Sequence, residues 1–155
     1  MQQILIMIHY KDGSLLDASE QYVCHQLNAS STESLGLAKD IFEKYSYSDV
    51  YKDRQEPDEL GSIIISGEDF QRKVIGLVAQ RYPGKPKYAN DTQSLRQKWF
   101  KECIDKIYEI ENLESIAFPH KIGCGLAGGS WDNYLKIIRI KSEERPDIKI
   151  SIYKL

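Results

Sequence analysis

The sequence alternates between segments with the period of a strand and segments with the period of a helix. Consecutive apolar residues that cover both faces of a strand are typical of a sheet buried on both sides. Such runs, bounded by turn-forming residues, predict six short strands. They lie at residues 4–8, 22–25, 61–66, 74–79, 115–118 and 148–152.

Apolar residues three or four positions apart predict three helices between these strands. The first carries Leu35, Ala38, Phe42 and Tyr45, the second Leu95, Trp99, Cys103, Ile107 and Ile110, and the third Trp131, Leu135 and Ile138. Asp91 or Thr92 is expected to cap the second helix and Ser130 the third. Short side chains with an oxygen accept the free N–H groups of a first helical turn.

Strands that alternate with helices indicate an α/β fold with a mostly parallel sheet and helices on both faces. The strands on either side of Gly67 follow each other directly and are expected to pair antiparallel, so the sheet is mixed. In open sheets of this kind, ligands bind beyond the carboxyl ends of the strands. Two loops, residues 27–36 and 119–129, are expected there, facing each other across one cleft.

Composition narrows the class of protein. A chain of 155 residues predicts a single domain over 1–155. A net charge of −2 excludes a broad basic field for duplex nucleic acid, but not a local anion site made of backbone N–H groups. No apolar run approaches the roughly 20 residues of a membrane span, and no signal peptide is expected. Three cysteines without C-x-x-C spacing indicate reduced thiols. We therefore expect a cytoplasmic monomer without a membrane, metal or cofactor.

The strongest local signal is a glycine-rich loop. Residues 118–131 read Phe-Pro-His-Lys-Ile-Gly-Cys-Gly-Leu-Ala-Gly-Gly-Ser-Trp, with four glycines within seven residues, between a buried strand and a helix. Glycine allows positive φ and close approach of the backbone, so successive N–H groups can surround an anion. The loop lacks the Gly-Lys-Ser/Thr of a P-loop, and it follows the fifth strand, unlike a Rossmann fingerprint. The alternative is a tight structural turn.

Residues 122–131 resemble the second ligand loop of macrodomains. The similarity is greatest to the branch that contains ADP-ribose 1''-phosphate phosphatases and terminal ADP-ribose protein glycohydrolases. Other segments resemble that branch in the same order, namely 13–17, 24–28 with 36–38, 99–103 and 150–155. The resemblance implies a three-layer α/β/α macrodomain with a cleft for ADP-ribose or one of its derivatives, which ADP-ribosylated macromolecules could also present.

The same resemblance implies the ligand contacts. The backbone of Gly36, Leu37 and Ala38 would meet the diphosphate, and Asn28 would reach the distal ribose. Tyr153 would stack on adenine, or alternatively only pack at the sheet. Residues expected near the phosphates and distal ribose are Gly123, Cys124, Gly125, Leu126, Ala127 and Gly128, and Ser14 and Leu15 are expected near the base.

Three positions depart from the family pattern. Ser14 stands where an aspartate usually accepts a hydrogen bond from the adenine amine; Asp12 or Asp17 could take that role instead. Gln80 and Ala127 match the positions of the lysine and the aspartate of the glycohydrolases. The covalent mechanism of that branch is therefore not expected here.

Three residues are candidates for catalysis. His25 could transfer a proton near neutral pH, and Asn28 could position the distal ribose. Asp91 could approach the cleft as a base. The alternatives are a structural strand histidine for His25 and a helix cap for Asp91. Cys124 is expected to fill space, although nearby N–H dipoles could lower its pKa.

Three functions follow from these features. The first is hydrolysis of the terminal phosphate of ADP-ribose 1''-phosphate, with the glycine-rich loop stabilising charge and His25 as acid or base. The second is removal of ADP-ribose from protein or nucleic acid, which the missing lysine and aspartate disfavour. The third is a sensor that binds ADP-ribose or a related nucleotide without turnover.

Overall fold

Six strands form one mixed sheet. A computed structural model describes residues 8–155, so positions 4–7 of the predicted first strand lie outside the described residues. The strand order is β1-β6-β5-β2-β4-β3, and every neighbouring pair is parallel apart from the antiparallel β3 and β4. The strands are β1 (Ile8–Asp12), β2 (Tyr22–Asn28), β3 (Ile63–Ser66), β4 (Lys73–Gln80), β5 (Ser115–Pro119) and β6 (Lys149–Lys154).

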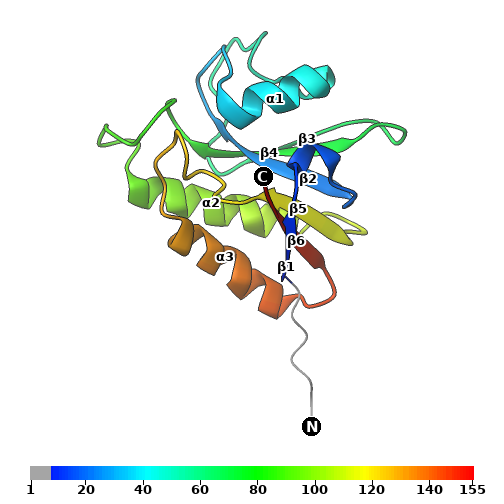
Figure 1. The fold of residues 1–155 in the computed structure, drawn as a ribbon. Coiled ribbons are helices and arrows are strands. Elements are labelled where there is room, and N and C mark those ends of the chain that lie inside the picture. The colour runs from blue at the N-terminus through cyan, green and yellow to red at the C-terminus, as the bar shows by residue number, and fades with distance from the viewer. Residues whose placement is uncertain (1–7) are drawn as a thin grey trace.

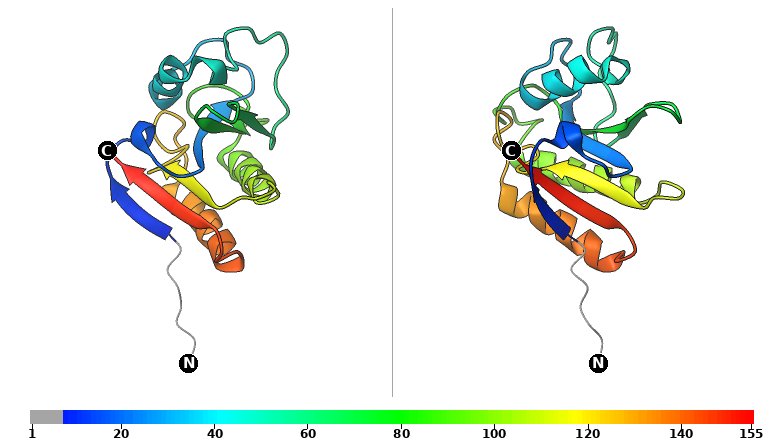
Figure 2. Two further views of the ribbon diagram at one scale, coloured as in Figure 1. Left: turned by 90° about the vertical axis from the view of Figure 1, so that its right-hand side faces the viewer. Right: turned by 45° about the vertical axis from the view of Figure 1, so that its right-hand side comes forward.

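Helices cover both faces of the sheet, as Figures 1 and 2 show. On one face lies α1, and on the other lie α2 and α3 (Figure 1). The helices are α1 (Gly36–Lys44), α2 (Gln93–Ile107) and α3 (Trp131–Glu144), with 3-10 turns η1 (Leu15–Asp17) and η2 (Ser46–Ser48). The predicted three-layer α/β/α architecture with a six-stranded mixed sheet is confirmed.

Alternation along the central strands explains the two covered faces. On β2, Val23 joins the apolar cluster beneath α1, whereas the next residue, Cys24, joins the cluster beneath α2 and α3. On β4, Val74 and Ile75 divide in the same way. Both faces of these strands are therefore apolar, which is the continuous pattern seen in the sequence.

Several boundaries differ from the sequence predictions. β2 continues to Asn28, so His25 lies in the middle of a strand. α2 ends at Ile107, which leaves Ile110 in the following turn. Thr92, not Asp91, caps α2, since its Oγ1 accepts a hydrogen bond from the backbone N–H of Leu95 at 3.1 Å.

The third helix also differs in detail from its predicted apolar stripe. Its buried apolar positions are Tyr134 and Ile138, whereas Trp131 and Leu135 are half-buried. Ser130 occupies the predicted N-cap position, but its side chain makes no capping hydrogen bond.

A buried carboxylate ties the two outermost strands of one edge to the chain that follows β1. Glu20 is 3% exposed and accepts hydrogen bonds from Lys11 Nζ at 2.8 Å, Ser151 Oγ at 2.7 Å and the Tyr153 hydroxyl at 2.6 Å. Burial opposes ionisation, but these bonds outweigh it and lower the pKa of Glu20 to about 2.

Replacing Glu20 by Gln is expected to lower the free energy of unfolding at pH 7 by about 1.5–3 kcal/mol, because hydrogen bonds to a charged acceptor are lost. Since the folded pKa lies below the unfolded value of about 4.3, this stability is present above pH 4.3 and is lost as the pH falls toward 2. Urea titrations at several pH values measure it. This stabilising role of Glu20 would be contradicted if the variant were as stable as the wild type at pH 7, or if both proteins lost stability equally between pH 4.3 and 2.

Candidate functional site

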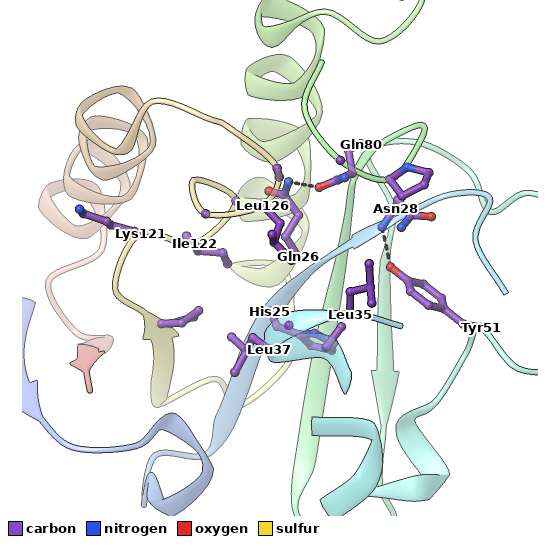
Figure 3. A pocket seen from close by; sticks show the side chains of 18 of the residues that line it. His25, Gln26, Asn28, Leu35, Leu37, Tyr51, Gln80, Lys121, Ile122 and Leu126 are labelled. Carbon is purple, nitrogen blue, oxygen red and sulfur yellow. Dashed lines mark hydrogen bonds between the residues drawn. The ribbon is translucent and has the colours of Figure 1, made fainter. Parts of the chain in front are cut away.

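The two loops predicted to bind a ligand lie on opposite sides of one cavity of about 510 Å³, here called the cleft. The cleft lies beyond the carboxyl ends of β2, β4 and β5. Figure 3 shows His25, Gln26 and Asn28 following one another along β2 on its floor. Residues 35–38 of α1 line one wall, and residues 119–127 line the other. The prediction that both loops face one cleft is confirmed.

A smaller cavity of about 350 Å³, here called the side cavity, adjoins the cleft. The two share the lining residues Leu37, Pro119, His120 and Lys121. Ser14, Leu15 and Tyr153 line the side cavity and not the cleft. The structure therefore divides the predicted ligand residues between two connected spaces, one beside β1 and β6 and one beyond β2, β4 and β5.

The first wall of the cleft is the N-terminus of α1. The helix begins at Gly36 with a φ of +59°, and Leu35 before it provides no side-chain cap. The N–H groups of Gly36, Leu37 and Ala38 therefore remain without a capping side chain, at the positive end of a helix dipole. Such an end binds anions without any charged side chain.

The second wall is the glycine-rich loop, and two of its glycines have opposite roles. Gly123 has a φ of +71°, and a Cβ there would lie 2.5 Å from Gln26 Oε1 and 2.6 Å from Tyr134 Cε2. Gly125 has no positive φ, and a Cβ there would meet nothing within 4 Å in the described part of the chain. Gly123 is thus required by packing, whereas Gly125 faces open space in the cleft.

Two predicted members of this loop do not line the cleft. Gly128, with a φ of +71°, lies against Lys85, whose Cγ would be 2.9 Å from an added Cβ. Cys124 is half-buried, and its thiol donates to the Ile122 carbonyl at 3.2 Å. Burial raises the pKa of Cys124 to about 11, so the thiol is not activated. Gly123, Gly125, Leu126 and Ala127 are the members that line it.

Asn28 lies where β2 bulges against β4. The pairing runs from Leu27 with Val78 to Asn28 with Gln80, so one residue of β4 is skipped. The side-chain Oδ1 accepts hydrogen bonds from the backbone N–H groups of residues 30 and 31, at 3.1 and 2.7 Å. The backbone N–H of Asn28 donates to the Tyr51 hydroxyl at 2.8 Å (Figure 3). Its Nδ2 is therefore the side-chain group left for a ligand.

His25 lies on the cleft floor but is 2% exposed. Its ring packs edge-on against Phe42 of α1, with centroids 5.5 Å apart. Nδ1 is buried without a hydrogen-bond partner among residues 8–155. Burial lowers the pKa of His25 to about 4, so the imidazole is neutral at pH 7. A neutral imidazole can accept a proton but is not poised as a general acid.

The prediction that Asp91 approaches the cleft as a base is wrong. Asp91 is fully buried, and its carboxylate accepts hydrogen bonds from the backbone N–H groups of Arg81 and Tyr82, each at 3.0 Å. Arg96 adds bonds at 3.0 Å from Nε and 2.6 Å from Nη2. Burial would raise the pKa of Asp91, but these bonds lower it. Asp91 therefore holds in place the loop that follows β4.

Two glutamines form part of the cleft floor; Gln26 was not identified from the sequence, and Gln80 was noted only as the residue at the position of the glycohydrolase lysine. Gln26 Nε2 donates to Gln80 Oε1 at 2.7 Å (Figure 3), and Gln80 Nε2 donates to the Tyr82 carbonyl at 3.0 Å. Both line the cleft. The available signal was a polar residue near the carboxyl end of each otherwise apolar central strand, because such a position faces the ligand edge of the sheet.

The side cavity contains one carboxylate that the sequence did not indicate. Asp40, on the exposed side of α1, lines it together with Ser14. Neither Asp12 nor Asp17 does. Ser14 Oγ already accepts a bond from the Leu16 N–H at 3.1 Å, as cap of η1.

Neither a family model nor a curated protein matches the sequence. Several solved structures, however, are similar to this chain. The macrodomain of Mycobacterium tuberculosis DarG superposes with a TM-score of 0.71 at 20% identity, over 95% of this chain and 97% of that one. The macrodomain of Thermus aquaticus DarG gives 0.76 at 18%, over 96% and 99%. A Bacteroides thetaiotaomicron protein of unknown function gives 0.72 at 24%, over 96% and 98%.

These likenesses define the class of fold. Across almost its whole length the chain has the macrodomain fold, and the structural expectation drawn from residues 122–131 is confirmed. Within residues 8–155, no helix is both long enough and apolar enough to cross a membrane. The same residues contain no cluster of three or more His, Cys, Asp or Glu side chains that could hold a metal ion.

Replacing His25 by Leu is expected to flatten the dependence of stability on pH between about 6.5 and 4. The unfolded chain, with a histidine pKa of about 6.5, takes up the proton before the folded chain, whose pKa is about 4. The contribution of neutral His25 to the free energy of unfolding is therefore fully present above pH 6.5. It falls as the pH drops toward 4, by at most about 1.4 kcal/mol per pH unit. Urea unfolding measures the slope, and equal slopes in both proteins would contradict a neutral buried His25.

Proposed function

We propose that this protein binds ADP-ribose or a close derivative along the cleft and the side cavity. The observation that carries the proposal is the uncapped N-terminus of α1, which faces the glycine-rich loop across one cleft that adjoins a second cavity. An elongated ligand with a diphosphate at its centre and a base at one end fits this order of surfaces. Backbone N–H groups in the centre suit the two negative charges.

The base end of the ligand is assigned to the side cavity. Leu15, Leu37 and Pro119 supply apolar surface there, and the Tyr153 ring is held by its hydroxyl bond to Glu20. An aromatic ring fixed in this way suits stacking with a flat base. Asp40 is the carboxylate in this cavity that could accept a hydrogen bond from an exocyclic amine, in place of the Ser14 position.

The distal ribose is assigned to the far end of the cleft, near Asn28 and the Gln26–Gln80 pair. Asn28 offers Nδ2 as a donor to a ribose hydroxyl, because its Oδ1 is already bonded to backbone. The glutamines add polar groups without charge. The macromolecular partner, cytoplasmic location and monomeric state expected from the sequence stay predictions.

Binding is better supported than hydrolysis. His25 is neutral and almost enclosed, and Asp91 is fully engaged, so neither is available as a proton donor at the distal ribose. Gln80 and Ala127 supply no lysine or carboxylate for a glycohydrolase. Hydrolysis of ADP-ribose 1''-phosphate remains the second candidate, because the neutral His25 on the cleft floor could still act as a base.

Replacing Gly125 by Val is expected to weaken ADP-ribose binding by at least about tenfold, because the side chain fills open space in the cleft without straining the backbone. Isothermal titration calorimetry measures the affinity. Ala89→Val, a similar enlargement on an exposed loop outside the cleft, is the matched control and should bind as the wild type does.

Two outcomes would overturn the assignment. A wild type that binds no ADP-ribose would remove the proposed function, and a Gly125→Val variant with wild-type affinity would place the ligand elsewhere. Phosphate release from ADP-ribose 1''-phosphate by the wild type, lost in His25→Ala with ADP-ribose affinity retained, would establish the hydrolase in place of the sensor.

A further inference from the structure

A single guanidinium lies beneath the far end of the cleft with every N–H engaged. Arg96 of α2 is 1% exposed. An arginine side chain has five N–H donors, and those of Arg96 make five hydrogen bonds. The acceptors are Asp91 Oδ1 at 3.0 Å, Asp91 Oδ2 at 2.6 Å, and the carbonyls of Gly84 at 2.7 Å, Ala127 at 3.1 Å and Tyr82 at 3.1 Å.

The three carbonyls belong to two different loops. Tyr82 and Gly84 lie on the loop after β4, and Ala127 lies on the glycine-rich loop after β5. Gly84 and Ala127 both line the cleft, and Arg96 Nη1 bonds to both of their carbonyls. One nitrogen atom therefore joins two loops that line the cleft and lie more than forty residues apart in the sequence.

The same guanidinium also fixes the floor of the cleft. The Tyr82 carbonyl, which accepts from Arg96, also accepts from Gln80 Nε2 at 3.0 Å. Gln80 in turn holds Gln26 at 2.7 Å. A continuous chain of hydrogen bonds thus runs from Arg96 to the two amides that face the ligand space.

We propose that Arg96 is the positioning residue of the distal half of the cleft, which rests on the proposed function. It never touches the ligand. It acts through the Ala127 and Gly84 carbonyls, which hold the glycine-rich loop so that its N–H groups face inward, and through Gln80. Asp91 neutralises its charge and fixes its plane by a bidentate pair.

A lysine cannot replace this function. Its ammonium is one point with three donors, whereas the acceptors of Arg96 lie around a planar fork on three separate segments of chain. Arg96→Lys keeps the positive charge beside Asp91 but leaves carbonyls of the two loops without their shared partner. The loss should fall on ligands that reach the distal half of the cleft, and not on ligands that end before it.

The test compares ADP-ribose with AMP, which carries the base and a phosphate but lacks the distal ribose. In Arg96→Lys the affinity for ADP-ribose should fall by at least about tenfold, while the affinity for AMP stays within about twofold. Calorimetry on the full chain gives both values. Ile104→Val is the matched control, since it trims a buried side chain of the same helix that does not line the cleft, and it should change neither value.

Equal losses for both ligands, or no loss for either, would overturn the positioning role. A wild type that binds neither ligand would instead overturn the proposed function, so the two failures are distinguishable. If Arg96→Lys does not fold, Asp91→Asn replaces it, because an amide accepts through one oxygen only, so it loosens the bidentate pair that aims the guanidinium at the three carbonyls. This variant should show the same selective loss for ADP-ribose, to a smaller extent, and equal affinities to the wild type would contradict the proposal.

Discussion

The parallel pairing of the central strands is the constraint on which the rest of the structure depends. Because β2, β4, β5 and β6 all run in one direction, their carboxyl ends lie at one edge of the sheet, and the segments that follow them emerge together (Figure 2). One of these segments leads to the start of α1, and another is the glycine-rich loop. The cleft is a direct consequence of strand direction.

The polar groups assigned to the ligand in that cleft are backbone N–H groups and neutral amides. The N-terminus of α1 and Gly123–Ala127 present main-chain N–H groups, and Gln26 and Gln80 present amides. Arg96 and Asp91 lie behind the far end of the cleft, and Glu20 holds the Tyr153 ring of the side cavity. This arrangement favours recognition of an anion over proton transfer, because fixed dipoles hold charge without titrating.

The sequence predicted those parts of the site that depend on local pattern. Glycines at 123, 125 and 128 marked the loop, and apolar runs marked the strands that carry it. It failed for Asp91, whose adjacency to a helix suggested a cap. Asp91 instead pairs with Arg96. The guanidinium of Arg96 is held beside Asp91 because the 82–84 loop folds back over α2, an arrangement that no local sequence pattern indicates. The Gln26–Gln80 pair was equally hidden, since it joins side chains of two strands that are far apart in the sequence.

The most direct test of the account is an NMR titration of the ¹⁵N-labelled protein with ADP-ribose, read through backbone amide shifts. The account predicts that the largest changes fall on the amides of Gly36–Ala38 and Gly123–Ala127, with smaller changes beside Ser14 and Tyr153. The amides at the opposite edge of the sheet, such as those of residues 67–72, should stay unchanged. Shifts concentrated at that opposite edge, or absent from both walls of the cleft, would contradict it.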